Sequence, residues 1–172
     1  MQFKIIVRPL RLLRLPLSLI MLTHAQWVFA TASCTINVIP FSFGSIVTNG
    51  PNIDSDSGSV SITCTGTVTD NGLTITTRLS PGSSSTGYAP RKLSFGPHSL
   101  NYNLYLSPNR LASSVWGDGT NNTMPSNESI ADFNAMGDPR TRTIIIYGRI
   151  FANQLLKPAG LYTDSIIVSV TF

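Results

Sequence analysis

Apolar and polar residues alternate along several segments of this chain, and that pattern predicts β-strands with one buried face. The alternating segments are residues 59–64, 73–79, 100–106 and 162–172. The last is the longest, with Tyr162, Ile166, Val168, Val170 and Phe172 on one face that only Asp164 interrupts. Asp70, Asn71 and Gly72 separate the first two segments and predict a hairpin turn, because Asn and Gly accept a positive φ.

Residues 143–151 differ, because apolar side chains fall on both faces, and they predict a central strand covered on both sides. Loops are expected at 48–58, 81–87 and 118–140. Within the last loop, Ile130, Phe133 and Met136 have a spacing that also suits a short helical turn. Short strands joined by Gly, Pro and Asn turns indicate an all-β fold, specifically a β-sandwich.

The first 32 of the 172 residues have the features of a secretory signal peptide. Four basic residues in positions 1–14 precede a short apolar run at 15–22, and Ala30-Thr31-Ala32 fits a cleavage site. Cleavage after Ala25 is an alternative. The apolar run is shorter than the roughly 18 residues that span a bilayer. We therefore expect a mature domain of residues 33–172 without an integral membrane segment, secreted through the periplasm to the cell surface.

The basic character of the chain belongs to this leader. Beyond it, eight basic residues face eight acidic residues, so the mature domain has no net formal charge. A neutral domain attracts phosphates weakly, which argues against DNA or RNA as a partner.

The two cysteines, Cys34 and Cys64, lie 30 positions apart. In an oxidising compartment such a pair predicts a disulfide, which would stabilise the domain by roughly 3–4 kcal/mol. Lipidation of Cys34 is the competing interpretation, but Thr31-Ala32-Ser33 lacks the usual leucine and Cys64 would remain unpaired.

Little in the mature domain suggests catalysis. His98 is its only histidine, and its Gly and Pro neighbours indicate a turn, so no His-based metal cluster or catalytic triad is expected. Residues 54–58 depart from a calcium-binding loop in the position of the glycine. Trp116 could stack on a sugar, although a Trp beside a strand end more often packs in the core. We expect no catalytic residues, metal or cofactor, and hence no enzyme.

Several fragments together resemble the spore coat protein U domain, which subunits of archaic, Csu-type chaperone-usher pili share. The matching fragments are Cys34 with Phe43-Gly44, residues 58–64, residues 100–106, residues 115–120, residues 147–150, and Gly160, Tyr162 and Asp164 before the last strand. The resemblance implies an immunoglobulin-like pilin that lacks its last strand. It also implies three kinds of partner: a periplasmic chaperone, an outer-membrane usher and neighbouring pilin subunits that exchange donor strands.

On this interpretation the last alternating segment is the edge that accepts the chaperone or donor strand. The proposed acceptor residues are Tyr162, Ile166, Val168, Val170 and Phe172. Without a neighbouring strand their apolar side chains, each worth about 1.5–3 kcal/mol when buried, would be poorly covered, and a strand edge would be unpaired. An added strand from a partner would restore both.

The role within a fibre depends on the leader. Cleavage after Ala25 would keep residues 26–33, where Trp27 and Phe29 share one face and form a candidate donor segment, whereas cleavage after Ala32 would leave only Ser33 before the first cysteine. A subunit without a donor can only cap the tip, but tip adhesins of this family carry a second domain that about 140 residues do not accommodate. We expect a minor or adaptor pilin that supports attachment and biofilm formation, with a tip adhesin or a secreted carbohydrate-binding β-sandwich as alternatives.

Overall fold

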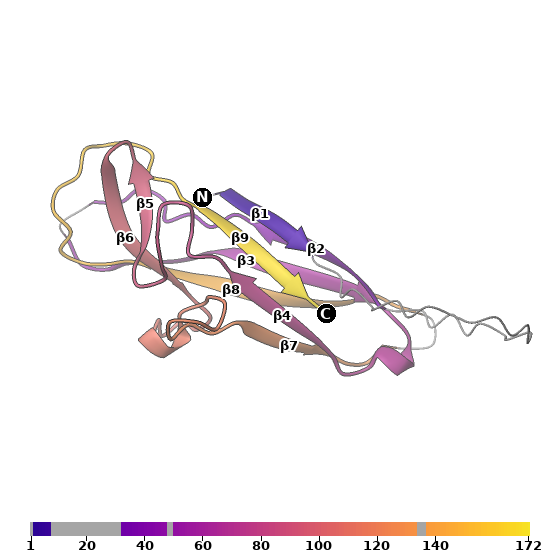
Figure 1. The fold of residues 1–172 in the computed structure, drawn as a ribbon. Coiled ribbons are helices and arrows are strands. Elements are labelled where there is room, and N and C mark those ends of the chain that lie inside the picture. The colour runs from indigo at the N-terminus through magenta and orange to yellow at the C-terminus, as the bar shows by residue number, and fades with distance from the viewer. Residues whose placement is uncertain (1, 8–31, 48–49, 134–136) are drawn as a thin grey trace, which may run out of the picture.

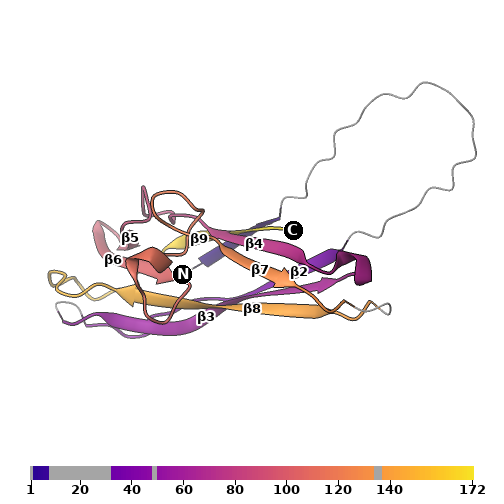
Figure 2. The ribbon, with the colours of Figure 1, turned by 90° about the horizontal axis from the view of Figure 1, so that it is seen from below.

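The computed structural model describes residues 2–7, 32–47, 50–133 and 137–172, and for residues 2–7 it describes the backbone alone. These residues form a sandwich of two β-sheets, which Figure 2 shows as two layers, one containing β3 and β8 and the other β4, β7 and β9. The strands are β1 (Gln2–Val7), β2 (Ser33–Ile39), β3 (Ile53–Thr65), β4 (Leu73–Leu79), β5 (Arg91–Phe95), β6 (His98–Tyr105), β7 (Ser126–Ile130), β8 (Arg140–Ile150) and β9 (Ser165–Thr171).

The strand order places β2 at the edge of one sheet and β9 between β1 and β4 in the other. The four-stranded sheet has the order β1-β9-β4-β7, and the five-stranded sheet has the order β2-β3-β8-β6-β5. Short 3-10 turns, η1 (Val68–Asp70) and η2 (Ala112–Ser114), are the helical elements of the described residues. The all-β sandwich predicted from the alternation is confirmed.

The core lies between the sheets and consists of the inward-facing residues of the alternating segments. Ile62, Ile75, Leu104, Ile146 and Val168 are each fully buried in it. A further core residue, Phe41, lies in the β2–β3 connection, and its ring packs over Gly148 of β8. A Cβ on Gly148 would come within 2.3 Å of that ring, so only glycine allows this packing.

Strand β8 is central in its sheet, between β3 and β6, as predicted. The expectation that both its faces are covered was wrong. Ile144, Ile146 and Ile150 are buried, but Ile145 on the opposite face is 40% exposed because no layer packs on that side.

Two of the three predicted loops are partly strand. β3 begins at Ile53, inside the predicted 48–58 loop, and β7 lies inside the predicted 118–140 loop. Ile130 ends β7 and Phe133 packs into the core, so these two residues do not form the helical turn that their spacing suggested. Met136 lies outside the described residues. The 81–87 segment contains no strand, as expected.

Candidate strand-accepting edge

Strand β9 has a different kind of neighbour on each side. On one side it pairs antiparallel with β4, from Leu79↔Val168 to Thr76↔Thr171. On the other side it pairs parallel with β1, from Gln2↔Ser165 to Val7↔Val170, and Figure 1 shows β1 alongside β9. Residues 2–7 belong to the segment predicted to be removed as a signal peptide. Removal of that segment would leave this side of β9 without a strand partner among the described residues.

The side chains of β9 identify which backbone groups face this edge. Ile166, Val168 and Val170 are buried against the core. The backbone N–H and C=O of Ile167 both bond to Ser80, on the β4 side. Since these groups alternate along a strand, the N–H groups of Ile166, Val168 and Val170 point toward the β1 side. The residues that supply the apolar row therefore also supply the hydrogen bonds for an added strand.

Strand β2 forms an edge of the opposite sheet, and its inward-facing row is incompletely covered. Cys34, Ile36 and Val38 face the core but are only half-buried. Their direct partners on β3, namely Cys64, Ile62 and Val60, are fully buried. The sandwich is thus closed over β3 and open over β2.

A disulfide joins Cys34 and Cys64, which are directly opposite each other in the β2–β3 ladder. The predicted pairing is confirmed, and the lipidated alternative for Cys34 does not fit a bonded cysteine. The bond attaches the edge strand β2 to β3, which itself pairs with β8.

The start of β9 is fixed by Asp164, the residue that interrupts the apolar face. Asp164 is 3% exposed and accepts hydrogen bonds from the Tyr102 hydroxyl at 2.7 Å and from the backbone N–H groups of Ser84 and Ser165 at 3.1 and 2.9 Å. Gly82 lies against this carboxylate with a φ of +103°, where a Cβ would collide with it. Burial, together with the adjacent Asp164 carboxylate, raises the pKa of Tyr102, so its hydroxyl remains a donor.

A buried arginine supports the same region. Arg91 on β5 is fully buried and donates to the backbone carbonyls of Ser80 and Trp116 at 3.0 and 2.7 Å and to the Asn103 side chain at 2.8 Å. Burial lowers the pKa of Arg91. These bonds fasten the end of β4, which flanks β9, to the opposite sheet.

The structure brings together three of the five proposed acceptor residues. Ile166, Val168 and Val170 lie in β9. Tyr162 precedes the strand, where its ring lies 5.6 Å from that of Phe95, and Phe172 follows the strand and is 40% exposed. Both lie outside the regular strand, which is shorter than the alternating segment in the sequence.

The candidate donor residues Trp27 and Phe29 lie outside the described residues. The half-open row on β2 was not singled out in the sequence, although its Cys34, Ile36 and Val38 alternate with Thr35 and Asn37.

Residues that the sequence offered for sugar binding or metal binding have roles in packing or pairing within the fold. Trp116 is fully buried, and its Nε1 donates to the Thr77 carbonyl at 3.0 Å, so a sugar-stacking role for Trp116 is wrong. His98 begins β6 and is half-buried. Asp54 pairs with Arg149 at 2.7 Å within the β3–β8 ladder. Among the described residues no group of three His, Cys, Asp or Glu side chains is placed to hold a metal, and no helix is long and apolar enough to cross a membrane.

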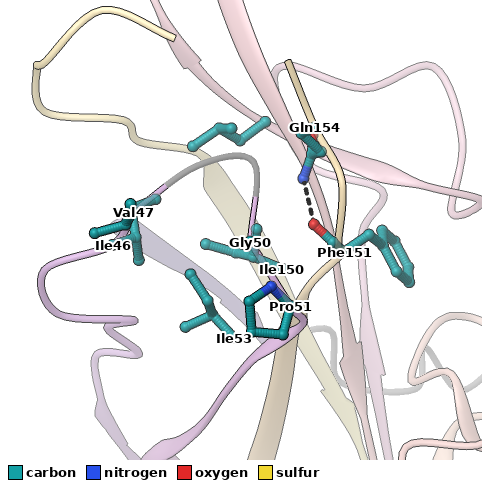
Figure 3. Close-up of a pocket in the computed structure, with 9 residues that line it drawn as sticks. Ile46, Val47, Gly50, Pro51, Ile53, Ile150, Phe151 and Gln154 are labelled. Atoms are coloured by element: carbon teal, nitrogen blue, oxygen red, sulfur yellow. Dashed lines mark hydrogen bonds between the residues drawn. The ribbon is translucent and has the colours of Figure 1, made fainter. Parts of the chain in front are cut away.

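A small, partly open cavity lies beside the β2–β3 connection and the segment after β8. Figure 3 shows its apolar lining, including Ile46, Ile53 and Ile150, with the Gln154 amide donating to the Phe151 carbonyl at 3.1 Å. Its volume of about 10 Å³ is that of a single water site, so it does not hold a cofactor.

These features define a disulfide-bonded β-sandwich with a candidate strand-accepting edge. Residues 21–169 match the profile of the Spore Coat Protein U domain, and the chain belongs to that family. The sequence resemblance is thereby confirmed. No curated protein matches the sequence.

The fold is also similar to one chain of the crystal structure of the CsuC-CsuE chaperone-tip adhesion subunit pre-assembly complex from archaic chaperone-usher Csu pili of Acinetobacter baumannii. The TM-score is 0.54 at 19% sequence identity, and the match covers 83% of this chain and 40% of that chain. The present chain therefore has a pilin-like fold and spans less than half the length of that chain.

Proposed function

We propose that this protein is a non-enzymatic pilin subunit, a minor or adaptor subunit of a chaperone-usher pilus, that supports surface attachment and biofilm formation. A leader of residues 1–32 directs the domain of residues 33–172 to the periplasm. There a chaperone, and then a neighbouring subunit at the outer-membrane usher, supplies the missing strand. Membership of the Spore Coat Protein U family and the similarity to a chaperone-bound pilus subunit complex support this proposal.

The observation that carries the proposal is the unequal burial of two directly paired rows. Cys34, Ile36 and Val38 on β2 are half-buried, although their partners on β3 are completely buried. An inward-facing apolar row on an edge strand is stable only when something covers it. A strand added beside β9 would bring its own apolar side chains into the gap between the two sheets, in the β-augmentation mode of binding.

The proposal can be tested with a matched pair of substitutions on β2. Ile36 faces the core and is half-buried, whereas its neighbour Asn37 faces outward and is exposed. We expect Ile36→Lys to reduce recovery of the subunit–chaperone complex by about tenfold or more, because a charge would be buried under the added strand. We expect Asn37→Lys to leave recovery unchanged.

Two controls make this result specific. Disulfide formation in Ile36→Lys shows whether the subunit still folds when the chaperone is overproduced. Equal complex recovery from both variants would contradict a strand seated over β2. Equal yields of stable monomer with and without the chaperone would contradict the proposal as a whole.

The tip position has one structural observation in its favour. Leu155, Leu156 and Leu161, in the β8–β9 connection, are each 78–79% exposed. Exposed leucines gathered in one loop favour contact with another surface. If the subunit contacts an apolar substratum directly, the subunit–chaperone complex will bind alkyl-coated beads, and replacing the three leucines by serine will abolish this binding. An internal adaptor will not bind the beads at all.

A further inference from the structure

A second surface feature lies away from the strand-accepting edge. It is a hollow of about 690 Å³ on the outward face of the five-stranded sheet, where β6 and β8 run side by side. Asn101, Asn103 and Tyr105 of β6 and Arg149 of β8 line it, because they alternate with the inward-facing core residues of these strands. Its volume is within the range of small-molecule sites.

The hollow combines aromatic surface with polar groups that have no hydrogen-bond partner among the described residues. Phe151 lines it, and Figure 3 shows the Phe151 ring pointing away from the small cavity on the other side of its backbone. The side-chain amides of Asn101 and Asn122 and the Tyr105 hydroxyl make no hydrogen bonds to the described residues, whereas the Asn103 amide is held by Arg91 and Tyr88. Amide and hydroxyl groups beside aromatic rings match the hydroxyls and apolar face of a sugar ring.

The backbone around the hollow is unusual. Arg110, Asn121 and Asn122 have φ values of 51°, 52° and 59°. They are three of the five non-glycine residues with positive φ in the described chain, and all three line the hollow. Such left-handed residues cost about 1–3 kcal/mol each and gather at functional sites.

The charge of the hollow favours an anion. The guanidinium groups of Arg110 and Arg149 line it, and no carboxylate does. The Asp54 carboxylate pairs with both arginines, at 2.7 Å from Nε of Arg149 and 3.6 Å from Nη1 of Arg110. The three side chains together therefore have a net charge of one positive unit. The Nη1 of Arg149 is free of hydrogen bonds to the described residues, since Nε and Nη2 take both oxygens of Asp54. An arginine nitrogen left free in this way can bind a ligand carboxylate.

We propose that this hollow binds an acidic saccharide, with Asn101, Asn122 and Tyr105 contacting the sugar hydroxyls and Arg149 contacting the carboxylate. The site is independent of the strand exchange proposed above, because its lining shares no residue with β2 or β9.

Saturation-transfer NMR on the subunit–chaperone complex tests the proposal with methyl β-glucuronide and, as the neutral comparator, methyl β-glucoside. We expect the glucuronide to bind at least about fivefold more tightly, from its carboxylate contact. Asn122→Gly removes the amide while retaining the left-handed backbone, and we expect it to weaken glucuronide binding about fivefold. Asn153→Gly is the matched control, because Asn153 has a φ of 56° and is exposed outside the hollow; we expect it to bind like the wild type.

Three results would overturn the proposal: no glucuronide binding up to about 10 mM, equal binding of glucuronide and glucoside, or equal effects of Asn122→Gly and Asn153→Gly. Recovery of the subunit–chaperone complex in each variant separates these results from failure of the proposed pilin function. A complex that forms normally but binds no sugar contradicts only the saccharide site.

Discussion

At the residue scale, buried polar groups position the candidate strand-accepting edge. The alternating sequence pattern does not identify these groups. Asp164 interrupts an apolar face in the sequence, yet it is the buried acceptor that fixes the start of β9 to Tyr102 and to the Ser83–Ser84 turn. Arg91 lies in a short segment with Lys92, a pair that suggests a solvated surface, yet it is fully buried. Its acceptors come from segments distant in the chain, which a local pattern does not reveal.

Asp164→Asn is therefore expected to destabilise the fold by about 2–3 kcal/mol. The amide keeps the shape but replaces one acceptor oxygen with a donor among the Ser83, Ser84, Ser165 and Tyr102 donors. Urea denaturation of the oxidised full-length chain measures the change. Asp132→Asn, at an exposed position, is the control; equal stability of the two variants would show that the Asp164 bonds contribute little.

A pH effect follows from Asp54. Its hydrogen bonds from Arg149, with the nearby charge of Arg110, lower the pKa of Asp54 below its ordinary value of 3.8. The folded state then binds a proton less readily than the unfolded state, so the ion pair stabilises the protein above the ordinary pKa and loses this effect as the pH falls through the lower, folded value.

We expect the melting temperature of the wild type to fall more between about pH 5 and about pH 2.5 than that of Asp54→Asn. Asp56→Asn is the matched control, since Asp56 lies on the same strand without an ion pair in the described residues. Parallel pH profiles for the wild type and Asp54→Asn would contradict this role of the ion pair.

At the scale of elements, alternation predicted the strands whose two faces differ most. β4, β6 and β9 match predicted segments closely. In β4 and β9 the inward residues are buried and their neighbours are not, whereas in β6 Asn103 and Tyr105 on the other face are buried as well. β5 and β7 were missed, because β5 carries Arg91 and Lys92 and β7 reads Ser-Asn-Glu-Ser-Ile, with one apolar residue. Both are edge strands, and their placement depends on pairing with distant partners.

The disulfide is expected to matter through the edge strand β2. Cys34→Ser or Cys64→Ser removes a crosslink worth roughly 3–4 kcal/mol, so periplasmic abundance of the subunit should fall in either variant. Immunoblotting of periplasmic extracts measures this, with Ser33→Ala as a control at the same end of β2. Wild-type abundance of both cysteine variants would show that the bond does not limit folding.

The candidate donor can be tested as an element in its own right. A copy of residues 26–33 appended after Phe172 through an Asn-Gly turn would run antiparallel along the open side of β9. If Trp27 and Phe29 form a donor face, each ring buried should stabilise the domain of residues 33–172 by about 1.5–3 kcal/mol and increase its yield as a monomer. The control carries Ser at both aromatic positions of the copy; equal melting temperatures would exclude this segment as a donor.

At the scale of the whole molecule, the inward-facing residues Val60, Ile62 and Cys64 of β3 are fully buried, whereas their partners on β2 are only half-buried. The longest alternating segment predicted strand β9, and the role of β9 as the accepting edge remains a prediction. The sequence pattern did not reveal the half-buried row on β2, because the burial of an edge strand depends on the sheet that faces it. It also did not reveal that the 2–7 segment pairs with β9, since that contact joins the two ends of the chain.

The most direct test of the open edge is amide hydrogen exchange along β9 in the isolated domain of residues 33–172 and in its complex with the chaperone. The N–H of Ile167 bonds on the β4 side, whereas those of Ile166, Val168 and Val170 face the accepting edge. We predict that these three amides exchange at least about tenfold faster than Ile167 in the isolated domain, and that the chaperone slows them to a similar rate. Full protection of Ile166, Val168 and Val170 in an isolated monomer would contradict the account, because it would mean that the domain completes its own sheet.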